Sequence, residues 1–282
     1  MTPKVLVLDL YNLLHRARGG FQLGPAPVTF NFFRSLRALV QQFEPTRVVA
    51  VDEGEPIAKL KLMPDYKGNR VIPTWDTAKQ DEMRRFREQK TVCIDLLKRR
   101  FPISVVRHPN YEADDLLATL VHRGSSAVPH VIVSTDSDFI QLLGPEYIKL
   151  YNPVKKNFIK TPTYDYATWK ALRGDVSDNI DSVLEGSQKV KDEEAEAIVN
   201  SESKLLDIFS DKKKATKFAR NMQMIVLDDI PEEELIDMES STPVEDWDEV
   251  RTVFDGYGFK SMTKDDSWKK YTTTFDHLWI KS

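Results

Sequence analysis

The chain has 282 residues, of which 41% are hydrophobic and 30% are charged, and its net charge is −4. This composition is typical of a folded globular protein and excludes both a disordered chain and a wholly basic nucleic-acid coat. The single cysteine, Cys93, excludes an internal disulfide and favours a reducing compartment, and we expect neither a signal peptide nor a membrane span.

The first half of the chain alternates strand-like and helix-like segments. Continuous apolar runs at 4–8, 47–51, 103–106 and 131–133 are typical of strands buried on both faces. Between them, apolar residues recur at helical spacing over 30–43, 81–100 and 113–122. This alternation predicts an α/β fold with a mostly parallel twisted sheet flanked by helices.

After residue 158 strand signals become few, and the stretches 166–173, 192–200 and 213–224 have helical periodicity. We therefore predict an α/β domain over residues 1–165 and a mainly helical C-terminal domain over 166–282. Within the second domain, 228–250 is expected to be a loop or short helical connection, followed by a short helix over 250–258. The aromatic stretch 271–282 is expected to close the core rather than to form a partner-binding tail.

Charge is distributed unevenly along the chain. Residues 59–107 carry 13 basic and 6 acidic side chains, whereas 228–250 carry 11 acidic and no basic ones. A basic stretch in an acidic protein is a candidate phosphate-binding surface, although a solvated amphipathic helix explains the charge equally well. The acidic segment is expected to face solvent or a basic partner.

Acidic residues gather where the predicted strands end. Three come at the ends of predicted strands, with a fourth two residues after the last of them. Three more open the helix after the strand at 103–106, and two begin the helical region. Because ligands bind beyond the carboxyl ends of parallel strands, we expect these side chains to converge at one edge of the sheet. The acids are Asp9, Asp52, Glu112, Asp114, Asp115, Asp136, Asp138, Asp175 and Asp178.

Each of these acids alone could be a turn residue or a helix cap. Together they would repel one another, since two unit charges about 4 Å apart cost roughly 4 kcal/mol at an effective dielectric near 20. Cations must neutralise such a cluster, and oxygen ligands without a histidine or cysteine motif favour Mg²⁺ or Mn²⁺ over zinc. The acids suffice for two ions, an arrangement that serves phosphoryl chemistry.

Five motifs resemble, in order, those of the 5′-nuclease superfamily of flap endonucleases and 5′→3′ exonucleases. They are VLVLDLYNLLHR (5–16), VVAVDEG with PDYKGNR (48–70), YEADDLLATL (111–120), VSTDSDFIQLL (133–143) and GDVSDNI (174–180). The similarity is greatest to the phage branch, which contains the RNase H of T-even phages, and includes MIVLDDIP (224–231). It implies a PIN-like nuclease core with a basic helical arch over about 65–100.

The resemblance implies a hydrolase that cuts phosphodiesters near 5′ ends and removes RNA primers and flaps in phage DNA replication. One Mg²⁺ would use Asp9, Asp52, Asp114 and Asp136, with Glu112 and Asp115 in or beside its shell. A second Mg²⁺ would use Asp138, Asp175 and Asp178, and Mn²⁺ would substitute. The catalytic residues would be Lys67, Arg70, Asp114 and Asp136, with Lys67 and Arg70 neutralising the scissile phosphate.

Basic residues and one aromatic residue are expected to contact nucleic acid. The candidates are Tyr66, Lys67, Arg70, Arg84, Arg85, Arg87, Lys90 and Lys189. Tyr66 would stack on a base or belong to the core, and Lys67 and Arg70 have the alternative of a solvent-facing turn.

The sequence departs from the family in the loop after the fifth motif. Members usually have a glycine-rich helix–turns–helix there, which grips duplex DNA and often K⁺. Residues 181–189 of this chain contain a single glycine, Gly186, with Ser182, Glu185 and Ser187 where glycines are expected. Glycine allows backbone amides to approach phosphates closely, so the resemblance does not carry K⁺ binding or duplex grip to this loop.

The expected partners are DNA and RNA–DNA duplexes with 5′ ends or flaps, and, through the resemblance alone, a single-strand-binding protein and a sliding clamp. We expect a monomer in the cytoplasm, which is the host cytoplasm if a phage encodes it. One alternative is a PIN-like endoribonuclease for structured RNA, although such domains usually lack the fifth motif and the arch. Another is a catalytically inactive DNA-binding accessory, against which the complete acid set argues.

Overall fold

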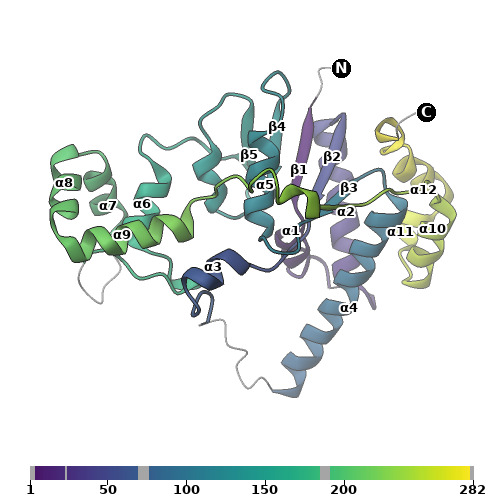
Figure 1. Cartoon of the computed structure of the whole chain (residues 1–282). Helices are drawn as coiled ribbons and strands as arrows, with labels where there is room; N and C mark the ends of the chain where they lie inside the picture. Colours follow the sequence, from purple (N-terminus) through teal and green to yellow (C-terminus); the bar gives the residue numbers. More distant parts are fainter. Residues whose placement is uncertain (1–3, 23, 69–75, 185–190, 280–282) are drawn as a thin grey trace.

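A twisted sheet forms the centre of the protein in the computed structural model, which describes residues 4–22, 24–68, 76–184 and 191–279 (Figure 1). Within these residues the sheet has seven strands in the order β6-β5-β4-β1-β2-β3-β7. The strands are β1 (Val5–Asp9), β2 (Arg47–Val51), β3 (Ser104–Arg107), β4 (His130–Val133), β5 (Ile148–Asn152), β6 (Asn157–Phe158) and β7 (Glu239–Ser240). The five central strands are parallel and the two edge strands antiparallel, which confirms the predicted mostly parallel sheet.

Helices cover both faces of the sheet. One face carries α1 (Leu10–Ala17), α2 (Pro27–Phe43), α4 (Thr77–Arg100), α10 (Trp247–Gly256), α11 (Lys260–Thr263) and α12 (Asp265–Thr272). The other carries α5 (Ala113–His122) and the 3-10 turn η1 (Asp138–Leu142). The remaining elements are α3 (Ile57–Leu62), α6 (Tyr166–Arg173), η2 (Val176–Asp178), α7 (Asp192–Val199), α8 (Glu202–Ser210), α9 (Lys212–Ile225), η3 (Leu235–Asp237) and η4 (Asp276–Leu278).

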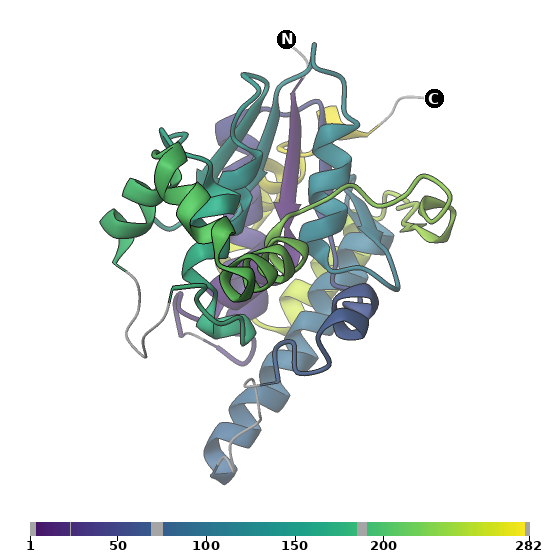
Figure 2. The same cartoon turned by 60° about the vertical axis from the view of Figure 1, so that its left-hand side comes forward.

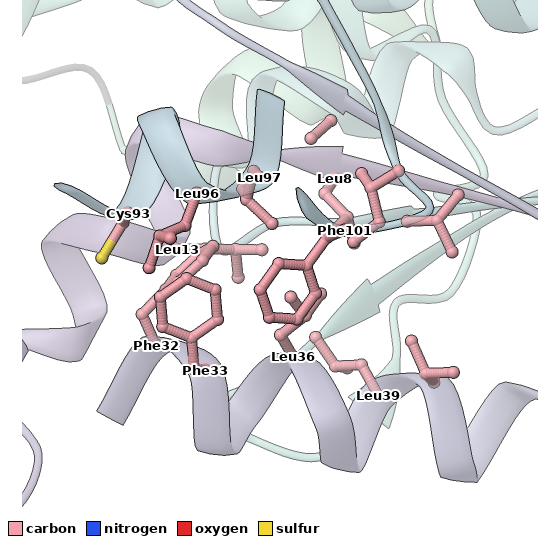
Figure 3. Close-up of a cluster of buried hydrophobic side chains, with 14 of the residues drawn as sticks. Leu8, Leu13, Phe32, Phe33, Leu36, Leu39, Cys93, Leu96, Leu97 and Phe101 are labelled. Carbon is pink, nitrogen blue, oxygen red and sulfur yellow. The ribbon is translucent and has the colours of Figure 1, made fainter. Parts of the chain in front are cut away.

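Alternating side chains of the strands build two separate cores. Leu6 and Leu8 of β1 pack with α2 and α4, whereas Val7 between them packs with α5. This is the period of two that a strand imposes on its side chains. In Figure 3, Phe33 and Leu36 of α2 face α4, with Phe101 at the end of α4 beside them. The rings of Phe33 and Phe101 are stacked with centroids 4.9 Å apart.

Most predicted elements lie within a few residues of the observed ones. The strands and α-helices outside the predicted segments are the strands β5, β6 and β7 and the helices α1, α3, α8, α11 and α12. Strand β5 has the sequence IKLYN, in which the exposed Lys149 interrupts the apolar run. The strand therefore lacks the continuous run of apolar, β-branched residues that identified the other central strands. The acidic segment also contributes more than a loop, since β7 pairs antiparallel with β3.

The end of the chain packs against the α/β core. Val250, Phe254, Tyr271 and Phe275 are fully buried in the same cluster as Leu6 and Leu8. Figure 1 shows α10–α12 at one end of the molecule and α7–α9 at the other. The residues grouped in the sequence as one helical domain over 166–282 are therefore divided between two packing environments. The prediction that the segment from 271 closes the core is correct for Phe275 and Leu278.

Helix α4 projects beyond the body of the protein. Its buried residues all lie from Phe86 onward, so the turns before Phe86 extend away from the core, as both Figure 1 and Figure 2 show. None of the helices in the described ranges is both long and apolar enough to span a bilayer.

Replacing Phe254 by alanine should lower the free energy of unfolding by about 3–5 kcal/mol, because a fully buried ring is removed from the core. Asp255→Ala, an exposed position on the same helix, should change it by less than about 0.5 kcal/mol. Urea denaturation followed by circular dichroism measures both. A Phe254→Ala chain that loses only part of its helical signal in a separate early transition would show that α10–α12 fold independently of the core.

Candidate active site

The strand order reverses between β1 and β4, and this switch point holds the first pair of acids. From β1 the chain builds β2 and β3 on one side and then β4 and β5 on the other. Asp9 ends β1, and its carboxylate accepts hydrogen bonds from Ser134 Oγ at 2.6 Å and from the Asn12 amide at 3.1 Å. Ser134 Oγ also accepts from the Asp136 amide at 2.9 Å. One serine after β4 thus orients both acids in the crevice where doubly wound sheets bind ligands.

Helix α5 brings three more acids to this edge through its N-terminus. Glu112 is at the N-cap, with Asp114 and Asp115 in the first turn. The loop after β2 packs closely here, because a Cβ on Gly54 would lie 1.9 Å from the His108 carbonyl oxygen and 2.2 Å from that of Tyr111. A glycine at 54 therefore permits the second motif to lie against the third.

The acids at the switch point carry uncompensated charge. Burial raises the pKa of Asp9 to about 6, and the charge of Asp136 adds to this effect. Burial and the charges of Asp9 and Asp136 raise the pKa of Asp114 well above its ordinary value. Among the described residues, Asp9, Asp114 and Asp136 form no ion pair with lysine or arginine. These carboxylates repel one another and would be stabilised by a bound cation.

Glu112 has the opposite environment. Its carboxylate contacts Lys67, lies 2.9 Å from Lys59 Nζ and accepts a hydrogen bond from the Tyr66 hydroxyl at 3.0 Å. Burial alone would raise the pKa of Glu112, but the charges of Lys59 and Lys67 outweigh it and lower the pKa to about 2. Lys59 also pairs with Asp115 at 3.0 Å. Glu112 is therefore an ionised anchor that holds the turn around Lys67 to helix α5.

Lys170 of α6 lies between acids from two different motifs. Its Nζ contacts Asp138 Oδ1 and lies 2.8 Å from Asp175 Oδ2, and its side chain is 10% exposed. Burial would raise the pKa of Asp175, but the hydrogen bond and charge of Lys170 hold it below its ordinary value. Burial raises the pKa of Asp138 to about 6, with Lys170 opposing the shift and Asp136 adding to it.

A tight backbone turn presents the fifth motif to this site. Gly174 has φ +72°, and a Cβ there would lie 2.4 Å from the Ile180 carbonyl oxygen. Asp175 accepts a hydrogen bond from the Ser177 amide at 2.8 Å, and the Tyr66 hydroxyl lies 3.3 Å from Asp178 Oδ2. The second and fifth motifs are therefore joined directly, which their distance in the sequence does not reveal.

A cavity of about 610 Å³ unites most of these groups. The charged residues that line it are Lys67, Asp114, Asp136, Asp138, Lys170, Arg173, Asp175 and Asp178. The structure thus brings together seven of the nine predicted acids. Five line this cavity, Glu112 contacts its lining residue Lys67, and Asp9 interacts through its charge with Asp114 and Asp136. The seven acids are Asp9, Glu112, Asp114, Asp136, Asp138, Asp175 and Asp178.

Other predicted residues lie elsewhere. Asp52 Oδ2 is 3.5 Å from Lys98 Nζ of α4, and Asp115 turns to Lys59. The predicted nucleic-acid contacts on α4 are outside the cavity. Arg84, Arg85 and Arg87 are exposed, with Arg84 paired to Asp81 and Glu88, and Lys90 Nζ lies 4.9 Å from the Tyr11 ring centre. Arg70 and Lys189 lie outside the described residues.

Tyr66 belongs to the core, as one of its two predicted alternatives has it. The residue is 5% exposed, and its ring packs with Ala171 and Ile180. Because the ring is buried, it offers no open face for a base, and its hydroxyl bridges Glu112 and Asp178. Its role here is to position two acids.

Lys59, Lys170 and Glu53 are not among the site residues predicted from the sequence. The acid cluster needs positive charge, and Lys59 and Lys170 supply part of it in addition to any metal ion. Partial burial and the charges of Glu112 and Asp9 raise the pKa of Glu53 to about 7, with the charge of Lys67 opposing them. Glu53 follows Asp52 directly, and that adjacency is the signal that could have identified it.

Oxygen donors at the switch point have the chemistry that a hard divalent cation requires. Within the described ranges, no three histidine, cysteine, aspartate or glutamate side chains already converge as a metal site. Asp138 and Asp175 instead direct oxygens to Lys170, and Glu112 and Asp115 direct theirs to Lys59. The donor set fits divalent ions, while some of its members must turn to bind them.

Residues 4–172, more than half of the chain, match the model described as 5′-3′ exonuclease, N-terminal resolvase-like domain. The chain belongs to this family. It is 29% identical over 185 residues to DNA polymerase I of Synechocystis sp., covering 61% of this chain and 18% of that protein. It is 32% identical over 169 residues to flap endonuclease Xni of Pectobacterium carotovorum subsp. carotovorum, covering 57% and 58%.

A likeness in fold to a solved structure extends beyond the residues that match the family. The crystal structure of the bacteriophage T5 flap endonuclease, in a pseudo-enzyme-product complex with DNA and metal ions, matches with a TM-score of 0.65 and 18% identity, covering 98% of each chain. The agreement confirms the predicted α/β 5′-nuclease fold. By sequence, this chain spans less than two thirds of the length of the curated relatives it matches.

Asp114→Asn should stabilise the metal-free protein at pH 8 by on the order of 1 kcal/mol, because it removes a charge that its neighbours repel. A raised pKa in the folded state means that the ionised form weakens folding above that pKa. The gain should therefore shrink as the pH falls toward 3, below the ordinary carboxyl pKa of 3.8, where the wild-type carboxyl is mostly protonated in both states. Thermal denaturation in EDTA at both pH values measures it.

The matched control is Asp228→Asn, at an exposed position of the acidic segment, which should leave stability nearly unchanged at both pH values. Destabilisation by Asp114→Asn at pH 8 would contradict the charge repulsion assigned to this site.

Proposed function

We propose that this chain is a divalent-metal-dependent 5′-nuclease, acting as 5′→3′ exonuclease and flap endonuclease on phosphodiesters near 5′ ends. The observation that carries the proposal is the convergence of acids from widely separated motifs around one cavity at the sheet's switch point, with Lys67 at its wall. Membership of the exonuclease family and the T5 structure that holds DNA and metal ions support the same function.

Two Mg²⁺ ions are the proposed cofactors, with Mn²⁺ as a substitute. Asp9, Asp114 and Asp136 would hold one, and Asp138, Asp175 and Asp178 the other. Bound divalent ions lower the pKa of a coordinated water and stabilise negative charge on a phosphate. Asp52 points to Lys98 in this structure, so it would contribute only after that contact is broken.

The chain's own cations would bind and orient the nucleic acid. Lys67 has φ +56° and contacts Glu112, so a strained turn and an ion pair hold its ammonium at the cavity wall, where a scissile phosphate would enter. The exposed arginines of α4 would hold the single strand near its 5′ end. A second basic cluster on α9, which includes Lys213 and Lys217 beside the loop at 181–184, would contact the duplex backbone.

Finer features remain predictions. They are the removal of RNA primers and flaps in phage replication, the likeness to T-even-phage RNase H, the monomeric state, a cytoplasmic location, and contacts with a single-strand-binding protein and a sliding clamp. Arg70 and Lys189 are also kept as predicted contacts to nucleic acid.

Short 5′-labelled products should appear from a flap and from a nicked RNA–DNA duplex with Mg²⁺ and disappear with EDTA. Asp136→Asn should reduce the rate by about 10³-fold or more, because an oxygen donor of the reaction centre is changed. Gel electrophoresis of the 5′-labelled strands measures both. Cleavage of structured RNA without a free 5′ end would favour the endoribonuclease instead, and salt-sensitive binding without cleavage would favour the inactive accessory.

Replacing Arg85 and Arg87 together by alanine should weaken binding of a 5′ single strand and reduce the slope of log K against log salt by about 1.4. The reason is that two phosphate contacts are lost from the exposed face of α4. Fluorescence anisotropy in Ca²⁺ at several salt concentrations measures the slope. Lys269→Ala with Lys270→Ala on α12, two exposed lysines of the C-terminal helices, is the control and should leave the slope unchanged. An unchanged slope in the α4 variant would remove this helix from the strand path.

A further inference from the structure

Lys170 occupies the space between two of the carboxylates proposed to bind the second metal ion. Its ammonium contacts Asp138 Oδ1 and lies 2.8 Å from Asp175 Oδ2. Each oxygen comes from a different motif, and the lysine is the group that joins them. In the metal-free protein, the Lys170 ammonium neutralises part of the charge of Asp138 and Asp175, as a divalent ion would.

The packing of α6 holds this ammonium in place. Asp165 caps the helix by accepting from the Thr168 amide, Trp169 packs beside Tyr166, and Ala171 lies in the core with Tyr66. The lysine is therefore fixed on both sides by buried residues, and its nitrogen reaches the cavity with its stem enclosed. The Lys170 ammonium is therefore a fixed part of the site and not a mobile surface group.

The same position cannot hold a lysine contact and a metal ion together. An ion that coordinates both carboxylates would lie about 2.1 Å from their oxygens. The ammonium, in contact with the same two oxygens, would then lie about 3 Å from a doubly charged ion, where repulsion is strong in a partly buried site. Binding of the ion therefore requires the ammonium to leave.

The switch-point acids differ in this respect. Within the described residues, Asp9, Asp114 and Asp136 form no ion pair with lysine or arginine, so an ion can bind them without displacing a cation. A divalent ion that binds the switch-point acids relieves the repulsion among their carboxylates. An ion that binds Asp138 and Asp175 must first break their favourable ion pairs with Lys170.

We propose that Lys170 is an internal competitor for the second divalent ion, so that the two ions bind in order and with unequal affinity. The switch-point ion binds first, and the ion at Asp138 and Asp175 binds only by displacing the Lys170 ammonium. The inference rests on the proposed divalent-metal function and adds to it a residue that sets the metal concentration at which the second site fills.

The test is Mn²⁺ binding to the full chain without nucleic acid, with free Mn²⁺ counted by electron paramagnetic resonance. The wild type should bind one ion tightly and one weakly. Lys170→Met and Lys170→Gln should each tighten the weaker site on the order of tenfold, because the competing charge is gone. Lys149→Gln, which removes an exposed charge from β5, should change neither site.

A second readout separates competition from a merely structural role. In EDTA the Lys170 variants should melt at a lower temperature than the wild type, and Mn²⁺ should raise their melting temperature by a larger amount. A structural lysine would give lower stability together with unchanged or weaker Mn²⁺ binding, and that result would overturn the inference.

Wild-type crystals soaked in Mn²⁺ give a measurement that needs no variant. An anomalous peak between Asp138 and Asp175 should coincide with withdrawal of the Lys170 ammonium, and a peak with the ammonium still in contact would overturn the inference. A wild type that binds no Mn²⁺ would refute the proposed metal site as well. Two bound ions with unchanged affinities in both variants would refute the inference alone.

Discussion

Repulsion among carboxylates at one edge of a parallel sheet is the interaction on which the organisation of this protein depends. The parallel strands and the N-terminus of α5 direct acids to the same place, and the fold must supply positive charge there. It does so unevenly. Lys59, Lys67 and Lys170 compensate one part of the cluster, while burial and mutual repulsion raise the pKa of Asp9 and Asp114 in the other.

The surrounding structure holds these charges at fixed separations. Ser134 orients Asp9 and Asp136, and Tyr66 connects the acid at the start of α5 to the fifth motif. The close approach at Gly54 brings the loops after β2 and β3 together. The strands and helices that carry these contacts are held by the two hydrophobic cores behind them. The C-terminal helices complete one of those cores, although they are far from the site.

The electrostatic polarity of the sequence has two separate structural explanations. On α4, the N-terminal arginines project with the exposed turns, whereas Arg99 and Arg100 near the end of the helix pair with Glu249 of the acidic segment at 2.8 and 2.5 Å. The expected basic partner of that segment is therefore in part the chain itself. Pairing with Glu249 therefore compensates charge at the C-terminal end of α4, while Arg85 and Arg87 nearer its N-terminus stay exposed.

The sequence by itself determined the fold class, four of the five central strands and the set of acids, because buried parallel strands leave continuous apolar runs and an acid after each run is visible as a local pattern. It did not identify β5, in which Lys149 breaks that run. Only the tertiary structure decided which acids meet, that Tyr66 is a buried link, and that Lys59 and Lys170 neutralise specific pairs. These outcomes depend on contacts between residues that are 32 to 112 positions apart in the sequence. Which of these residues meet is decided by how the helices pack on the sheet, and no local pattern reveals it.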